Sequence, residues 1–192
     1  MPPHPKQTRE DVLAAAVQLV RSGGIASVNA RDLAAVLGIS TRPLFTHFSG
    51  MDELKQQLFD ELNRYYNAYM DEHMHDNNRL VAQATSYIAF AREEPRIFDE
   101  LFMNRTMQGS TLAGIAKAEW NGETISAVRR ICACSQEEAD AIFLKVWLYA
   151  HGIATQIVAN DIQIPEATVA NLIQDAFERF ARDPSVIDPV SA

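Results

Sequence analysis

The spacing of its apolar residues restricts the fold of this sequence more than any other feature. Apolar side chains recur every three to four positions along most of the chain, as in Leu54, Leu58 and Leu62. Strand-like alternation of apolar and polar residues is nearly absent, and the eight glycines and eight prolines lie mainly at breaks between periodic segments. The pattern predicts an all-α chain whose helices pack through apolar faces.

Capping and stop signals divide the first fifty residues into three short predicted helices, over residues 8–22, 29–37 and 41–47. Thr8, Asn29 and Ser40 are suited to cap the three helices, because their side-chain oxygens can accept from free backbone N–H groups. Gly24 and Gly38 follow the first two helices, where a left-handed residue commonly ends a helix.

The rest of the chain predicts further helices over residues 51–76, 79–94, 95–102, 120–133, 135–160 and 165–181. Ser135 and Glu138 form a capping box at the start of the long apolar helix 135–160. We expect a head over residues 1–50 and a larger helical domain over residues 51–183. Residues 51–76 form the connecting helix of the larger domain, and residues 184–192, which follow that domain, are expected to be a flexible tail.

The charge of the chain is unevenly distributed. The first 50 residues hold five Lys and Arg against three Asp and Glu, a net charge of +2. The remaining 12 basic and 22 acidic residues give −10, so the whole chain carries −8. A basic head on an acidic body would present one end to a polyanion such as DNA, although charge runs often only solvate a surface.

Residues 29–48 have the anatomy of a helix-turn-helix: a capped helix, a glycine turn and a second helix with polar residues at its start. In such a unit the second helix enters the major groove with its N-terminal residues first. We expect Leu44 and Phe48 to face inward, with polar side chains outward. Helix N-termini at Asn29 and Ser40 would meet phosphates.

This segment, NARDLAAVLGISTRPLFTHF, resembles the N-terminal signature of the TetR family, and Glu53-Leu54 follows it as in that family. A weaker resemblance lies at Trp147 to Gly152, which is similar to a Trp-x-x-x-His-Gly signature of one regulatory-domain branch. The resemblance implies an all-α fold with an N-terminal three-helix head carrying the helix-turn-helix, and a C-terminal helical regulatory and dimerisation bundle. It makes residues 1–50 a DNA-binding domain and residues 51–183 a ligand-binding and dimerisation domain. It implies a sequence-specific transcription regulator, typically a repressor that a small-molecule effector releases from its operator.

The resemblance also indicates which residues contact double-stranded DNA. They are Asn29, Arg31, Ser40, Thr41, Arg42, Pro43, Phe45, Thr46, His47, Met51 and Lys55. Two of them depart from the family pattern, which usually has Tyr in place of Phe45 and Lys in place of Met51. The departures remove a hydroxyl donor and a positive charge from each subunit, and Arg42 offers a contact to phosphate or to a guanine edge instead.

Aromatic and polar residues predicted on inward helix faces are candidates for the effector site. They are Tyr65, Tyr69, His73, Phe90, Phe102, Trp120, Trp147 and His151. An apolar or aromatic effector would suit them. An ordinary hydrogen-bonded core explains the tyrosines equally well, and Trp147 and His151, four residues apart, also fit a packing pair.

The last two long helices carry wide apolar faces that predict a four-helix homodimer interface. One face holds Ile142, Val146, Tyr149, Ile153 and Ile157, and the other holds Phe177 and Phe180. A dimer would set two recognition helices roughly 34 Å apart on a pseudo-palindromic operator.

Other classes of function receive little support. His73 and His75 diverge around a helix, so we expect no metal site, and Cys132 and Cys134 lack further ligands. No catalytic motif or cofactor loop is present, and no apolar run approaches the roughly 20 residues of a membrane helix. We expect a cytoplasmic, non-enzymatic regulator without a cofactor; the alternative is a helical small-molecule-binding protein or enzyme that has lost operator binding.

Overall fold

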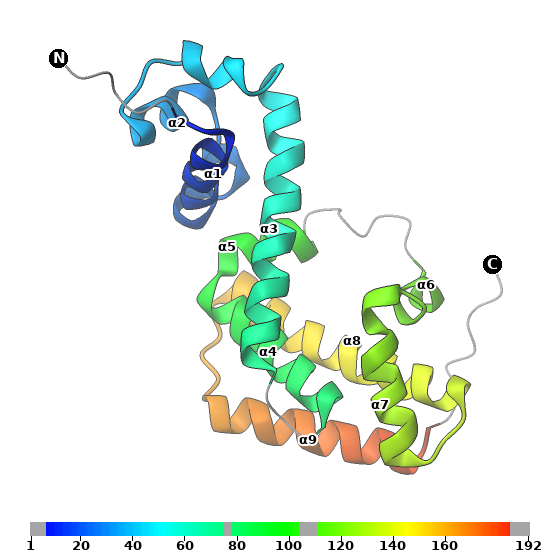
Figure 1. The fold of residues 1–192 in the computed structure, drawn as a ribbon. Helices are drawn as coiled ribbons and strands as arrows, with labels where there is room; N and C mark the ends of the chain where they lie inside the picture. The colour runs from blue at the N-terminus through cyan, green and yellow to red at the C-terminus, as the bar shows by residue number, and fades with distance from the viewer. Residues whose placement is uncertain (1–6, 75–77, 104–110, 185–192) are drawn as a thin grey trace. The chain divides into compact units, whose positions relative to one another are not determined.

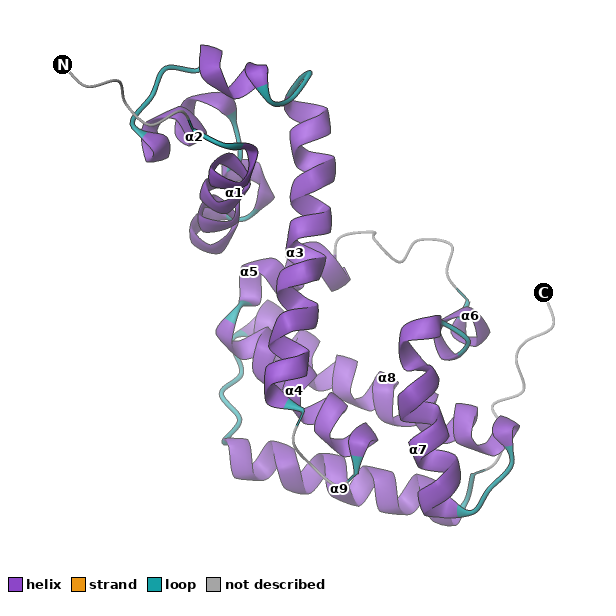
Figure 2. Ribbon diagram, viewed as in Figure 1, coloured by secondary structure: helices purple, strands orange, loops and turns teal. Residues whose placement is uncertain are grey.

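The computed structural model describes residues 7–74, 78–103 and 111–184. Within these ranges the regular elements are all helical and are joined by loops and turns (Figures 1 and 2). The chain divides into two compact units. Unit 1 comprises Met1–Ala68 and Glu94–Thr106, and unit 2 comprises Tyr69–Glu93 and Met107–Ala192. The predicted all-α class is confirmed. Unit 1 extends past the head segment 1–50, because it includes most of the helix that follows.

Unit 1 begins with three elements: α1 (Arg9–Gly23), the 3₁₀ turn η1 (Ile25–Ser27) and α2 (Ala30–Leu37). Thr8 and Asp11 form a capping box at the start of α1, so the predicted cap is confirmed. Gly38 ends α2 with φ 66° and ψ 30°, the left-handed conformation predicted for it.

The segment after Gly38 differs from the prediction. Residues Arg42–Thr46 form a 3₁₀ helix, η2, instead of an α-helix, and no side chain caps its start. The predicted cap at Ser40 is therefore wrong. An N-cap hydroxyl bonds an N–H two or three residues later, and the third residue after Ser40 is Pro43, which has no N–H.

Helix α3 (Met51–His73) carries the apolar stripe that its spacing predicts. Leu54, Leu58 and Leu62 are almost completely buried. The stripe ends earlier than predicted, because His73 is exposed. Helix α5 (Pro95–Phe98) and the π-helical turn η3 (Asp99–Met103) complete unit 1, and α5 packs against α1.

Unit 2 is a helical bundle. Its elements are α4 (Arg79–Glu93), α6 (Leu112–Ala116), the 3₁₀ turn η4 (Glu119–Asn121), α7 (Gly122–Cys132), α8 (Gln136–Asn160) and α9 (Glu166–Arg182). The predicted capping box of Ser135 and Glu138 opens α8. Helix α8 contacts α4, α6, α7 and α9 and forms the centre of the bundle (Figure 1).

The composition of α8 corrects one expectation. Its 25 residues are long and apolar enough to cross a membrane, with a mean hydropathy of 1.3 over an 18-residue window. The statement that no apolar run approaches that length is therefore wrong. The core helix of a soluble protein passes the same test, and 44% of this window is buried against neighbouring helices. The helix is weak evidence for a membrane.

The predicted dimer faces are largely wrong. Four of their residues are buried inside unit 2: Ile142, Val146, Ile157 and Phe177. Ile153 and Phe180 are half-buried, and Tyr149 is exposed. The periodicity of α8 and α9 identified apolar stripes correctly, but those stripes pack within one protomer. The outer face of α8 instead exposes Leu148 beside Tyr149.

Candidate nucleic-acid interface and effector site

Helix η2 separates an apolar inner side from a polar outer side. Leu44 and Phe48 are 1% and 2% exposed, as predicted. The structure places several predicted DNA-contacting residues on the surface: Thr41, Arg42, Pro43, Phe45 and Thr46. The Thr46 hydroxyl donates to the carbonyl of Pro43 at 2.7 Å, which fixes this side chain on the turn. Together with α2, this segment has the arrangement of a helix-turn-helix.

The structure places His47 differently from its neighbours. Its side chain is half-buried, and its Nε2 lies 2.8 Å from the backbone carbonyl of Gln7. The imidazole therefore contacts the segment before α1. This contact occupies one of the two ring nitrogens that a base contact would use.

Three basic side chains in the head and at the start of α3 are available for an external partner. Arg31, Arg42 and Lys55 are exposed, and none of them forms an ion pair in the part of the chain that the structure describes. Arg9 and Arg21, in contrast, pair with carboxylates of unit 1. The unpaired cations lie on α2, on η2 and in the second turn of α3, around the helix-turn-helix.

At the start of α2, fewer backbone N–H groups are free to bind phosphate than the sequence predicts. The side chain of Asn29 accepts from the N–H groups of Arg31 and Asp32 at 3.1 and 3.0 Å, so the protein already satisfies both donors. Asn29 and Ser40 are themselves exposed. Phosphate contacts at this end would depend more on side chains than on these backbone groups.

Glu53 fixes the start of α3, a role that sequence reasoning missed although the Glu53-Leu54 pair was noted. Its carboxylate accepts from the backbone N–H of Ser49 at 2.7 Å and from Arg9 at 2.8 Å. These contacts, the Ser49 bond first, hold the pKa of Glu53 below its usual value. The Arg9 guanidinium also lies 5.0 Å from the ring centre of Phe48. Half-buried Met51 is the first residue of this anchored helix.

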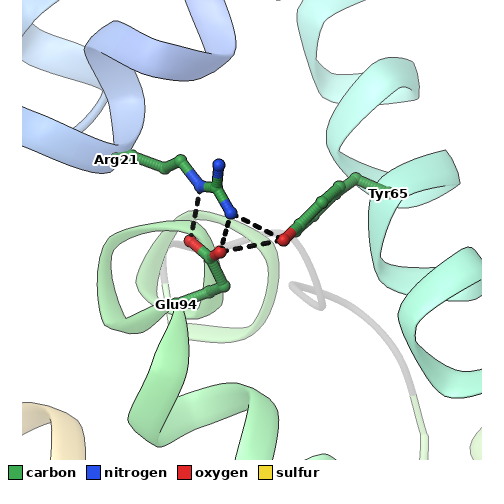
Figure 3. A network of polar contacts seen from close by, with 3 residues as sticks. All are labelled: Arg21, Tyr65 and Glu94. Carbon is green, nitrogen blue, oxygen red and sulfur yellow. Dashed lines mark hydrogen bonds and ion pairs between the residues drawn. The ribbon is translucent and has the colours of Figure 1, made fainter. Parts of the chain in front are cut away.

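Tyr65, a predicted effector contact, belongs to a polar network within unit 1 (Figure 3). Its hydroxyl accepts from Nη2 of Arg21 at 2.7 Å and donates to Oε1 of Glu94 at 2.8 Å. Arg21 also binds Glu94 directly through Nε at 2.8 Å and through Nη2. Burial and the Glu94 carboxylate raise the pKa of Tyr65, and the same carboxylate raises the pKa of Arg21. Sequence spacing gave no signal for Arg21 or Glu94.

Two other predicted effector contacts meet inside unit 2. The rings of Trp147 and His151 stack 5.4 Å apart on α8, and Nδ1 of His151 lies 2.9 Å from the hydroxyl of Tyr87 on α4. Burial lowers the pKa of His151, so the neutral imidazole is favoured near pH 7. Tyr87, 5% exposed, is a polar residue of this interior that the sequence did not identify.

The remaining candidates do not form one cluster. Buried Tyr69 stacks on His73 at 4.0 Å and meets Phe90 edge-on at 5.1 Å, all in unit 2. Phe102 belongs to unit 1, where its ring lies 4.9 Å from that of Tyr66. Trp120 is 82% exposed, so it does not line the interior of unit 2.

A further feature of unit 2 lies on its surface. Cys132 and Cys134 are free thiols, and burial raises the pKa of both. A shallow depression of about 400 Å³ beside Cys134 is lined by Ser126, Arg129, Arg130 and Ala133. Among the described residues, no three His, Cys, Asp or Glu side chains are grouped to hold a metal ion.

Comparison with solved structures identifies the fold. A TetR-like transcriptional regulator from Rhodococcus sp. RHA1 superposes with a TM-score of 0.65 at 15% identity, covering 94% of this chain and 100% of that one. A protein of unknown function from the same organism gives 0.70 at 21% identity, covering 95% and 98%. A TetR variant from Acinetobacter baumannii AYE in complex with minocycline gives 0.56 at 20%, covering 94% and 99%. No curated protein matches the chain.

Two family models match the sequence itself. Residues 12–62 match the bacterial regulatory proteins of the tetR family, and residues 80–182 match the tetracyclin repressor-like C-terminal domain. The second match alone spans more than half of the chain, and the first contains the helix-turn-helix described above. The chain therefore belongs to the TetR family of DNA-binding transcription regulators, with an N-terminal helix-turn-helix and a ligand-binding C-terminal domain.

Proposed function

We propose that this protein is a cytoplasmic, non-enzymatic repressor that binds a pseudo-palindromic operator as a homodimer and is released from it by a small molecule. The observation that carries the proposal is the set of exposed basic side chains around the helix-turn-helix. Helix η2 exposes Arg42 between buried Leu44 and the turn, and the neighbouring cations Arg31 and Lys55 have no ion-pair partner among the described residues. Unpaired cations around a helix-turn-helix supply the electrostatic part of DNA binding.

The proposed contacts divide into two classes. We assign Thr41 and Arg42, at the start of η2, to base edges, since the leading residues of the second helix of such a unit enter the groove. Arg31, Lys55 and the edge of Phe45 would contact the phosphate backbone. The remaining predicted contacts are the exposed side chains of Asn29, Ser40, Pro43 and Thr46, together with Met51. We assign His47 a positioning role, since its ring contacts Gln7.

For the dimer we propose the outer face of α8. It exposes the large apolar residues Leu148 and Tyr149, at 43% and 39%, and next to them Gly152. A glycine on a helix face allows a second helix to approach closely. Two copies of this face related by a twofold axis would bring two heads to two operator half-sites.

We propose an uncharged, largely apolar or aromatic effector bound inside unit 2. The buried polar residues of the described chain are Ser86, Asn121 and Thr124, none of which carries a charge. An ionised ligand would lack a counter-charge in such an interior. Phe90, Tyr69, Trp147 and His151 supply aromatic side chains there, and one solved structure of the same fold is a complex with the small molecule minocycline.

Selection of bound duplexes from a random pool, followed by salt-titrated binding, tests the proposal. A repressor of this kind should select a twofold-symmetric sequence and bind it at least about 1,000-fold more tightly than random duplex. Its affinity should fall steeply with salt concentration. Binding without any sequence preference, or no binding at all, would instead support a ligand-binding protein that has lost operator recognition.

A further inference from the structure

The hydrogen bonds among Arg21, Tyr65 and Glu94 restrict how these three side chains can be oriented relative to one another (Figure 3). Arg21 binds the Glu94 carboxylate through two nitrogens, and the Tyr65 hydroxyl uses both its donor and its acceptor capacity on the other two residues. The guanidinium also lies 5.1 Å from the ring centre of Tyr65. A single exposed ion pair restricts orientation little, whereas a two-nitrogen contact closed by a third residue admits few arrangements.

The three residues connect segments that are distant in the sequence. Arg21 lies in the last turn of α1, Tyr65 on α3, and Glu94 directly after the last residue of α4. The Glu94 side chain is only 11% exposed. In the same region α5 packs against α1, and Ile97 and Phe98 of the α5 segment are fully buried. The network is therefore the polar part of a contact that holds α1 onto both other segments.

The chain passes between the two units at residues 68/69 and at residues 93/94, and a residue of this network lies close to each of these points. Tyr65 lies one helical turn before Tyr69, the residue of α3 at which unit 2 begins. Glu94 directly follows Glu93, after which the chain returns from unit 2 to unit 1. A change in α4 that an effector causes would thus reach Glu94 through a single peptide bond. From Glu94, direct hydrogen bonds lead to α1 and hence to the helix-turn-helix that α1 packs against.

We infer that Arg21, Tyr65 and Glu94 form a positioning clamp. It fixes the orientation of α1, and with it the DNA-binding head, relative to α3 and to the residue that follows α4. This inference rests on the proposed function, since it concerns how the head is presented to two half-sites. The clamp contacts no DNA itself. Its contribution lies in holding the heads at a fixed spacing, so that binding one half-site favours binding of the second.

The experiment compares two duplexes with the full-length dimer: the selected symmetric operator, and the same duplex with one half-site scrambled. Tyr65→Phe removes one oxygen atom, and Glu94→Gln removes the charge. Each should weaken binding to the full operator about tenfold and change half-site binding by less than about twofold. The double variant should lose no more than the larger single effect, because the residues act as one unit. Arg64→Gln, which breaks the exposed Glu61 pair on the same helix, is the matched control.

Each result decides between the possibilities. Equal losses on both duplexes would mean that the residues support folding or DNA contact in general, and unchanged binding to both would mean that they hold nothing in place; either overturns the clamp. If Glu94→Gln does not fold, Tyr65→Phe alone carries the test. A wild-type protein that prefers no sequence refutes the proposed function, whereas a sequence-selective wild type with unaffected variants refutes only the clamp.

Discussion

At the scale of single residues, Met51 stands where the pattern that the N-terminal segment resembles usually has Lys. It begins α3, two residues before the anchored Glu53. In the proposed complex a lysine at this position would add a charge near the phosphates. We predict that Met51→Lys tightens binding to all duplexes alike and steepens the salt dependence by about 2 ions per dimer. Salt titrations on operator and random duplex measure both effects. A gain confined to the operator would contradict the phosphate assignment.

His151 gives a prediction about pH. Its pKa is lowered in the folded protein by burial, so the unfolded chain takes up a proton at higher pH than the folded chain does. The free energy of unfolding should therefore decrease as the pH falls below about 7, until the folded form is protonated too. Urea titrations between about pH 7 and 5 should show a smaller decrease for His151→Gln than for the wild type. His73→Gln, at an exposed position of α3, is the control; an equal change in both variants would exclude His151 as the source.

At the scale of elements, the turn between α2 and η2 depends on Gly38. Its φ of 66° is disfavoured for residues with a Cβ, and no other atom lies within 4 Å of a Cβ built there. Gly38→Ala should thus lower the free energy of unfolding by about 1 kcal/mol through backbone strain alone. Gly38→Asn should recover part of the loss. Gly50→Ala, which likewise meets no atom within 4 Å and has no such φ, is the control for thermal unfolding. Equal losses at both glycines would show that backbone strain is not the cause.

Local signals explain which elements could be predicted. The caps of α1 and α8 and the end of α2 depend on residues within four positions of each other, so the sequence displays them directly. The form of η2 was missed because the prediction did not weigh that Pro43 removes one of the two N–H donors that a cap at Ser40 could use. Apolar periodicity located the inner faces of α8 and α9 without revealing that one protomer covers them.

Sites assembled from distant segments could not be predicted. Arg21 and Glu94 are 73 residues apart, and nothing in their neighbourhoods marks them as partners. Tyr65 and His151 were noticed as polar groups on inward faces, but their partners Glu94 and Tyr87 come from distant segments of the chain. The helix-turn-helix could be predicted because its whole sequence signal is contained in twenty consecutive residues.

At the scale of the whole molecule, the charge distribution and the dimer act together. The segment after residue 50 carries −10 and is repelled by DNA, while each head contributes only +2. A single head therefore has a weak electrostatic attraction for DNA at physiological salt. Two heads on one operator double the favourable contacts, and the second binds at the high effective concentration set by the first. Under the proposed function, we therefore expect operator affinity to depend on dimerisation.

Gly152 provides the test of that dependence. It is exposed on the outer face of α8, and a Cβ added there meets no atom within 4 Å. An arginine should therefore be tolerated by the protomer, and replacing a helical glycine should even favour the helix by roughly 0.5–1 kcal/mol. Between two closely packed α8 helices, however, the same side chain and its charge would be buried without a partner.

We predict that Gly152→Arg is a folded monomer in sedimentation experiments and binds the full operator no more tightly than a single half-site. Ser126→Arg, at an exposed position of α7, adds the same charge outside the proposed interface and should stay dimeric. If Gly152→Arg remains a dimer with wild-type operator affinity, the two protomers meet through another surface. A monomer that keeps full operator affinity would instead separate DNA binding from dimerisation, because two independent heads gain nothing from the second half-site.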